Sequence, residues 1–320
     1  MSISSFFKLV EIQTKVASMI PFLLGTMFTI YRYDSFNIEN FIIMLISLLT
    51  FDMATTTINN YYDYKKATKT KDDSYRKANI IGKDNLKESS VVAIIISLVL
   101  IATSFGIALT FNTDIIVLLI GTVSFMVGIL YTFGPIPLSR MPLGEIFSGF
   151  FMGFVILFLS VYIHIFDSNI VTLVFENYVI NFSINIKEVF YIFLVSIPAV
   201  GGIANIMLVN NICDVEEDII NKRFTLPYYI GKKPALTLFK SLYYIGYLTI
   251  VILVILQVMP IASLLTLVTL IPVNKHLSIF YKKQVKSETF VLGVKNFIIM
   301  NGSLLIIITT VNVIKFIFKL

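Results

Sequence analysis

Long runs of apolar residues, separated by shorter polar connections, extend along almost the whole chain. A helix needs roughly 20 mainly apolar residues to cross the hydrocarbon layer of a bilayer. Runs of this kind predict membrane-spanning helices at approximately 12–31, 39–62, 88–110, 114–133, 143–166, 187–213, 235–256, 260–281 and 289–314. The pattern therefore predicts an all-α polytopic membrane protein with about nine transmembrane helices. The segment 167–186 is interrupted by polar residues and is expected to form an external loop, which could dip into the membrane interface.

The composition agrees with this interpretation. Hydrophobic residues make up 57% of the chain and charged residues 14%, whereas a soluble domain carries about 25% charged residues. The single cysteine, Cys213, excludes an internal disulfide framework and a cysteine-based zinc site. No secretory cleavage site is visible, so the first apolar segment is expected to remain as a helix. We expect residues 1–320 to form a single membrane-embedded domain.

Two polar clusters interrupt the second and sixth apolar segments near their ends. Asn59 and Asp63 are four positions apart in the first cluster, and Asn210, Asp214 and Asp218 keep the same spacing in the second. On a helix this spacing places the side chains of each cluster on one face. Carboxylates and amides are costly inside a bilayer and usually face a cavity, where they bind an ion or a polar group. Since Mg²⁺ prefers oxygen ligands and typically bridges protein to a phosphorylated ligand, each cluster predicts metal ligands.

Further polar residues near the clusters are candidates for binding substrate. Lys222 and Arg223 follow the second cluster, and carboxylates with nearby bases suit a diphosphate held through Mg²⁺. A charged helix end that only marks the membrane surface is the alternative. That alternative explains less well why an asparagine pair precedes the acids of the second cluster inside the apolar run. The asparagines of both pairs are also expected to contact substrate, namely Asn59, Asn60, Asn210 and Asn211.

Three other acidic residues lie near the first cluster. Asp52 is deep in the second apolar segment, and an intramembrane aspartate is a functional candidate by default. Its partner could instead be a structural hydroxyl, such as that of Thr55 or Thr56. Asp72 and Asp73 lie in the following loop and could supply a further oxygen if the loop folds back.

Tyr131 and Glu145 lie on either side of the connection between the fourth and fifth predicted helices. The Gly-Pro sequence in that connection is by itself a common turn signal. By the predicted topology, both side chains would face the same side of the membrane as the two clusters. A phenol or a carboxylate there could orient a polar aromatic substrate.

Basic residues are concentrated in the connections that follow even-numbered helices. The largest groups lie in segments 63–87 and 214–234. Because Lys and Arg are enriched in cytoplasmic loops, this bias places the N-terminus and both clusters in the cytoplasm and the C-terminus outside. The net charge of +6 is explained by these loops. No basic stripe with interleaved aromatic residues indicates nucleic-acid binding.

At these residues the chain resembles the UbiA superfamily of intramembrane prenyltransferases, nine-helix enzymes with two Asp-rich motifs. Within the superfamily it is most similar to the MenA type. The matching stretches are ASMIPFLLGT at 17–26, NNYYDYKKAT at 59–68, YTFGPIPL with LGE at 131–145, and NNICDVEEDIINKRFTLPYYIG at 210–231. The resemblance implies a helical bundle around a central cavity.

The resemblance also implies roles for individual residues. Lys222 and Arg223 would help to hold the diphosphate, and Tyr131 would lie beside the reacting carbon. The residues that would bind the Mg²⁺–diphosphate are Asn59, Asp63, Asp214 and Asp218. With Tyr131, the three aspartates are the predicted catalytic residues.

Two stretches depart from the family pattern. Asn60 stands where the first motif usually has an aspartate, and Ala67 stands where its last aspartate is expected. One ion site would therefore be weaker, or completed by Asp72 or Asp73. The first helix begins Glu11-Ile12-Gln13-Thr14 in place of an Arg-Pro-Lys-Thr type of sequence, which leaves the aromatic acceptor open.

The activity that the resemblance implies is Mg²⁺-dependent transfer of a polyprenyl group from a polyprenyl diphosphate to 1,4-dihydroxy-2-naphthoate. Decarboxylation accompanies the transfer and gives demethylmenaquinol, a step of menaquinone biosynthesis. The implied partners are the diphosphate, the aromatic acceptor and membrane lipid. The implied location is the bacterial cytoplasmic membrane.

Three alternatives stay open at this stage. The acceptor could be another aromatic compound, such as 4-hydroxybenzoate or protohaem. Intramembrane acids and repeated halves are also features of secondary transporters, although those place their sites near the midplane of the bilayer. The incomplete first motif also allows a membrane scaffold without catalytic activity.

Overall fold

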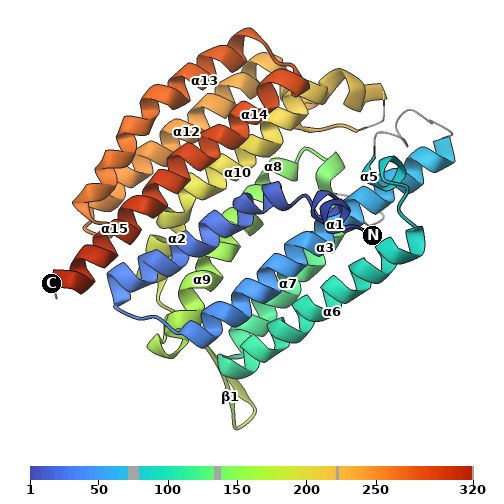
Figure 1. The fold of residues 1–320 in the computed structure, drawn as a ribbon. Helices are drawn as coiled ribbons and strands as arrows, with labels where there is room; N and C mark the ends of the chain where they lie inside the picture. Colours follow the sequence, from blue (N-terminus) through green and yellow to red (C-terminus); the bar gives the residue numbers. More distant parts are fainter. Residues whose placement is uncertain (71–78, 133–137, 221–222, 319–320) are drawn as a thin grey trace. The chain divides into compact units, whose positions relative to one another are not determined.

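The computed structural model describes residues 1–70, 79–132, 138–220 and 223–318 (Figure 1). Contacts divide the chain into two compact units. Unit 1 comprises Met1–Ser18 and Ile38–Pro137, and unit 2 comprises Met19–Asn37 and Leu138–Leu320. Helix α2 (Val16–Tyr33) begins in unit 1 and continues in unit 2. The expectation of a single domain stays a prediction.

Unit 1 is helical throughout its described part. It begins with the short helix α1 and the 3₁₀ turn η1, and its long helices α3 and α6 pack against each other. The elements are α1 (Ile3–Leu9), η1 (Ile12–Lys15), α3 (Ile38–Thr70), α5 (Ile80–Lys83), α6 (Glu88–Asn112) and α7 (Ile115–Thr132).

Unit 2 contains the remaining helices and a two-stranded antiparallel hairpin. From η2 to β2 the elements are η2 (Leu138–Arg140), α8 (Gly144–Ser148), the π-helical η3 (Gly149–Val155), α9 (Ile156–Ile165), η4 (Phe166–Ser168), β1 (Val171–Glu176) and β2 (Val179–Ile184). They are followed by α10 (Ile186–Ile220), α11 (Leu226–Ile230), α12 (Lys232–Ile255), η5 (Ile261–Thr269), α13 (Leu270–Lys282), α14 (Lys286–Phe297), the π-helical η6 (Ile298–Gly302) and α15 (Ser303–Phe318).

The helices confirm the prediction of an all-α polytopic membrane protein. In the described part of the chain, eight helical stretches are long and apolar enough to cross a membrane, and the fourth predicted segment corresponds to the shorter apolar helix Ile115–Tyr131. The eight are Ile12–Tyr33, Ile38–Lys65, Glu88–Asn112, Gly144–Ser168, Ile186–Ile220, Lys232–Ile255, Ile261–Lys282 and Lys286–Phe318. Many large apolar side chains on these helices are exposed, as expected of surfaces that face lipid.

Two predicted boundaries were too short. α3 continues to Thr70 and α10 to Ile220, so both polar clusters lie within helices and not at their ends. The segment that was expected to be an external loop contains the β-hairpin, and its external position stays a prediction.

Helix α10 is the central packing element of unit 2. It packs against α8, η3, α12 and α14 (Figure 1). The contact with η3 is very close, because a Cβ atom added at Gly153 would lie 2.6 Å from the Cα of Val200. Only glycine permits this approach, which is a common device where membrane helices pack tightly.

A buried ion pair joins η1, directly before α2, to α3 within unit 1. The Lys15 ammonium lies 2.6 Å from a carboxylate oxygen of Asp52 and also donates to Thr56. Ser18 donates to the other carboxylate oxygen at 2.5 Å. Losing either charged partner would leave a buried, uncompensated charge, which is strongly destabilising.

Candidate active site

The second cluster lies on the C-terminal part of α10, in unit 2. Asn210, Asp214 and Asp218 follow one another at helical spacing, as the sequence predicts. Both carboxylates are largely covered, with 11% of the Asp214 side chain and 8% of the Asp218 side chain exposed. The helix therefore presents two sheltered acids on one face.

Each of these carboxylates has a cationic partner. Lys286, in the first turn of α14, forms a salt bridge with Asp214. Arg223 places a guanidinium nitrogen 3.9 Å from Asp218, and its backbone N–H donates to the Asp218 carbonyl at 2.8 Å. More than half of the Lys286 side chain is exposed, so this ammonium can leave Asp214 for another anion at little cost.

Glu145 and Asn211 form a hydrogen bond beside this cluster. The Asn211 side-chain amide donates to Glu145 Oε1 at 2.8 Å, and both residues are buried. Glu145 Oε2 is also buried and meets no hydrogen-bond donor among the described residues. The tight packing of η3 on α10 fixes this pair, because Glu145 lies in α8, directly before η3. The pair thus offers one unused carboxylate oxygen.

The first cluster lies on α3, in unit 1. Asn59 and Asp63 are one helical turn apart and partly buried. Asn59 Oδ1 is fully covered and meets no hydrogen-bond donor in the described part of the chain. An oxygen of this kind suits a cation, because a buried polar atom without a partner is costly.

Asn60 differs from Asn59 because its side chain is hydrogen-bonded within the protein. Its amide donates to the Leu9 carbonyl at 3.0 Å and to Glu11 Oε1 at 3.2 Å. Asn79 in turn donates to the Asn60 carbonyl at 3.0 Å. The asparagine in place of the usual aspartate therefore ties α3 to the α1–η1 connection, and its predicted contact with substrate stays a prediction.

The environment of Asp52 indicates a structural role. Its carboxylate accepts hydrogen bonds from Lys15 and Ser18. Thr55 and Thr56 donate to its backbone carbonyl. The sequence interpretation named the two threonines as partners and missed Lys15, although a lysine within the first apolar segment was a usable signal.

The other predicted residues are placed only in part. Tyr131 lies in the last turn of α7, in unit 1, with its side chain partly buried. Lys222, Asp72 and Asp73 lie outside the described residues, so their predicted roles stay predictions. Lys286 was not among the site residues predicted from the sequence. It is separated from Asp214 by 72 positions, and no local pattern connects the two.

The donor atoms fit a hard divalent cation that also binds a phosphorylated ligand. Among the described residues, no three His, Cys, Asp or Glu side chains gather in one place. Asp214, Asp218 and Asn210 supply carboxylate and amide oxygens, which Mg²⁺ binds together with phosphate oxygens and water. A Mg²⁺ ion at either cluster would therefore complete its coordination from the ligand rather than from an all-protein cage.

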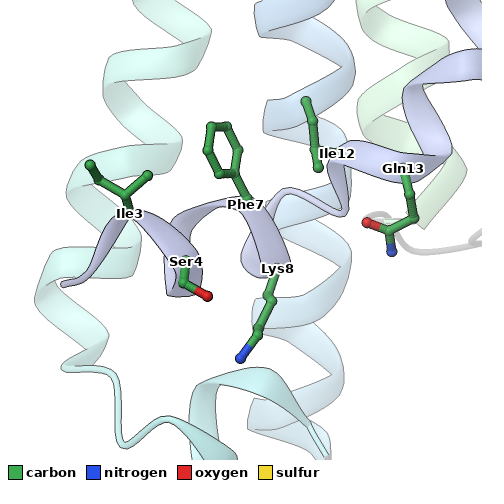
Figure 2. A pocket seen from close by; sticks show the side chains of 6 residues that line it. All are labelled: Ile3, Ser4, Phe7, Lys8, Ile12 and Gln13. Carbon is green, nitrogen blue, oxygen red and sulfur yellow. The ribbon is translucent and has the colours of Figure 1, made fainter.

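A surface pocket of about 430 Å³ lies elsewhere, at the N-terminus of unit 1. It is lined by Ile3, Ser4, Phe7, Lys8, Ile12 and Gln13. Figure 2 shows Ile3, Phe7 and Ile12 pointing to one side and the polar side chains to the other. None of these residues belongs to either cluster.

The fold defines a polytopic membrane protein, and its two clusters carry oxygen-bearing side chains. Residues 18–299 match the model of the UbiA prenyltransferase family. The chain belongs to this family and is therefore an enzyme of the prenyltransferase class. A relative from Bacillus subtilis (strain 168), a 1,4-dihydroxy-2-naphthoate octaprenyltransferase, is 32% identical over 238 residues, which cover 74% of this chain and 70% of the relative.

Solved structures share the fold at low sequence identity. A UbiA homologue from Aeropyrum pernix K1 has a TM-score of 0.67 and 17% identity, covering 92% of this chain and 98% of its own. A UbiA homologue from Archaeoglobus fulgidus bound to GPP and Mg²⁺ has a TM-score of 0.63 and 14% identity, with 96% and 99% coverage. These likenesses confirm the UbiA fold.

Proposed function

We propose that this protein transfers a polyprenyl group from a polyprenyl diphosphate to 1,4-dihydroxy-2-naphthoate, with Mg²⁺ as cofactor. The observation that carries the proposal is the face of α10, where two sheltered carboxylates stand beside two cations. The similarity to the Bacillus subtilis enzyme supports this acceptor. We place the protein in the bacterial cytoplasmic membrane, with the N-terminus and both clusters on the cytoplasmic side, as the loop charges predict.

Each cluster has a proposed role of its own. On α10, Asn210, Asp214 and Asp218 would hold Mg²⁺, while Arg223 and Lys286 would bind diphosphate oxygens. On α3, Asn59 and Asp63 would hold Mg²⁺ through the buried Asn59 oxygen and the Asp63 carboxylate. When bound, Mg²⁺ neutralises charge on a diphosphate and makes it a better leaving group.

The proposed chemistry is an ionisation followed by attack. The allylic C–O bond breaks and its electron pair stays on the diphosphate, whose charge the Arg223 and Lys286 side chains stabilise. The electron-rich naphthoate ring forms a C–C bond to the resulting prenyl cation, and the carboxylate leaves as CO₂. The products are demethylmenaquinol, CO₂ and diphosphate, and the ring gains and loses no net proton.

Glu145 is proposed to position the acceptor. The unpartnered Glu145 oxygen can accept a hydrogen bond from a substrate hydroxyl, while Asn211 holds the other oxygen in place. The Tyr131 phenol would lie beside the reacting carbon, as the family resemblance implies. Asn60 is bound within the fold and would act through the placement of α3.

An assay with membranes tests the proposal. Membranes receive Mg²⁺, a labelled polyprenyl diphosphate and 1,4-dihydroxy-2-naphthoate, and the lipid-soluble product is measured. We expect the wild type to form product. Product formation should be lost when EDTA is added and in the variant Asp214→Ala. Glu216→Ala is the matched control, because Glu216 is an exposed acid on the same helix and should leave product formation unchanged.

Other outcomes distinguish the alternatives. Product with 4-hydroxybenzoate or protohaem, but not with the naphthoate, would keep the prenyl transfer and replace the acceptor. Transport of a substrate without release of diphosphate would favour a transporter. The absence of both product and diphosphate binding would contradict the proposed roles of the acidic clusters.

A further inference from the structure

The hairpin of unit 2 has one apolar and one mainly polar face. Directly opposed residues of the two strands have side chains on the same face. Three pairs are entirely apolar, namely Val171 with Ile184, Leu173 with Phe182, and Phe175 with Ile180. The opposite face carries the pairs Thr172 with Ser183, Val174 with Asn181, and Glu176 with Val179, and the Thr172 and Ser183 hydroxyls are hydrogen-bonded at 2.7 Å.

The apolar face becomes more exposed toward the tip of the hairpin. Val171 is buried at the base, where Tyr162 donates to its carbonyl at 3.0 Å. Phe175, Ile180 and Phe182 are 68%, 66% and 59% exposed. A two-stranded hairpin is marginally stable on its own in water, and an exposed apolar face of this kind calls for a covering surface.

The position of the hairpin identifies that surface. It lies between α9 and α10 in the sequence, after the short turn η4, and in Figure 1 it projects beyond α9. The apolar alternation of Ile180, Phe182 and Ile184 continues to Ile186, the first residue of α10, which is 76% exposed, and Phe190 follows one turn later. The apolar face is thus continuous with a helix surface that faces lipid.

The length of α10 sets the side of the membrane. Asp214 lies 28 residues after Ile186, which is about 42 Å along a helix, more than the ~30 Å of the hydrocarbon core. The hairpin and the acidic cluster on α10 therefore lie at opposite surfaces of the bilayer. Each six-residue strand is about 20 Å long, so the hairpin is long enough to lie flat as a small interfacial element.

The turn supports the same interpretation. Asn177 and Tyr178 both have positive φ angles, at 49° and 61°, as a type I′ turn requires. Glycine is favoured at the second of these positions, yet this chain has a tyrosine that is 96% exposed. Tyrosine is enriched at the boundary between membrane and water, where its ring meets lipid and its hydroxyl meets water.

We propose that the hairpin Val171–Ile184 lies on the membrane surface opposite the acidic cluster of α10, with its apolar face in contact with lipid. The acyl chains would cover Phe175, Ile180 and Phe182. The opposite face, with Asn181 and the Thr172–Ser183 pair, would face water. This proposal does not depend on the identity of the prenyl acceptor.

Single tryptophans test the proposal, because the chain contains none. The variant Phe182→Trp probes the apolar face, and Asn181→Trp, at the next position on the polar face, is the matched control. Both are placed in lipid nanodiscs, which leave both membrane surfaces open to solvent. Fluorescence quenching is then measured with phospholipids brominated in their acyl chains and with aqueous iodide.

We expect brominated lipid to quench the fluorescence of Phe182→Trp several-fold more strongly than that of Asn181→Trp, and iodide to show the reverse order. Strong iodide quenching of both variants would mean that the hairpin projects into water and would overturn the proposal. Protection of the Phe182→Trp indole from both quenchers would mean that protein covers the face, which would also overturn it. Phe175→Trp supplies a second reading of the same face if Phe182→Trp does not fold.

Discussion

At the scale of single residues, the ion pair between Lys286 and Asp214 holds two residues that the proposed reaction needs. The carboxylate is sheltered and the ammonium is largely exposed. The pair can therefore open when an anionic ligand and its cation arrive, with Lys286 moving to the ligand. The aspartates could be found from their helical spacing, but Lys286 could not, because only the packing of α14 against α10 brings it there.

Lys286→Ala tests this role. If the ammonium binds diphosphate oxygens, its loss should raise the KM for the prenyl diphosphate about tenfold, the effect of losing one charge-assisted hydrogen bond. The KM for the aromatic acceptor should stay close to the wild-type value. Steady-state kinetics in membranes would measure both constants.

Lys283→Ala is the matched control for that measurement. Lys283 is similarly exposed and pairs with Glu288 at 2.6 Å, three positions before Lys286. The control should leave both constants unchanged. Equal effects of the two substitutions would indicate only a general loss of positive charge. An unchanged KM for the prenyl diphosphate in Lys286→Ala would contradict the proposed role of Lys286.

At the scale of elements, the close approach of η3 to α10 fixes Glu145 beside Asn211. The apolar pattern predicted both membrane segments, and Glu145 was a candidate from its position. The contact between η3 and α10 could not be predicted. Glycines such as Gly149 and Gly153 are common in apolar helices, and the sequence does not show which helix packs against them. The hairpin was missed although its apolar residues alternate, because Val174 and Val179 are apolar residues on the other face.

Gly153→Ala should separate η3 from α10. The added Cβ would meet backbone atoms of Val200 at 2.6–2.7 Å, and overpacking of this kind costs about 1–3 kcal/mol. We expect a lower Tm in detergent and weaker binding of the acceptor. Gly121→Ala is the control, because a Cβ there meets nothing within 4 Å, and its Tm should not fall. Equal Tm values for the two variants would contradict the described packing.

At the scale of the whole molecule, the sequence predicted the membrane class and both polar clusters. Apolar length determines the spans, and helical spacing determines which polar residues share a face. The structural roles of Asn60 and Asp52 could not be predicted in this way. Asn60 donates a hydrogen bond to Glu11 and Asp52 pairs with Lys15, and both partners are distant in the sequence. Partners of this kind are set by packing rather than by local pattern.

The release of CO₂ is the measurement that tests the central claim most directly. Membranes containing the protein would receive Mg²⁺, a polyprenyl diphosphate and 1,4-dihydroxy-2-naphthoate labelled in its carboxyl carbon. We predict that labelled CO₂ and diphosphate appear in equal amounts, and that both disappear in Asp214→Ala or without the prenyl diphosphate. A prenylated product that keeps its carboxyl label, or no diphosphate release at all, would contradict the account.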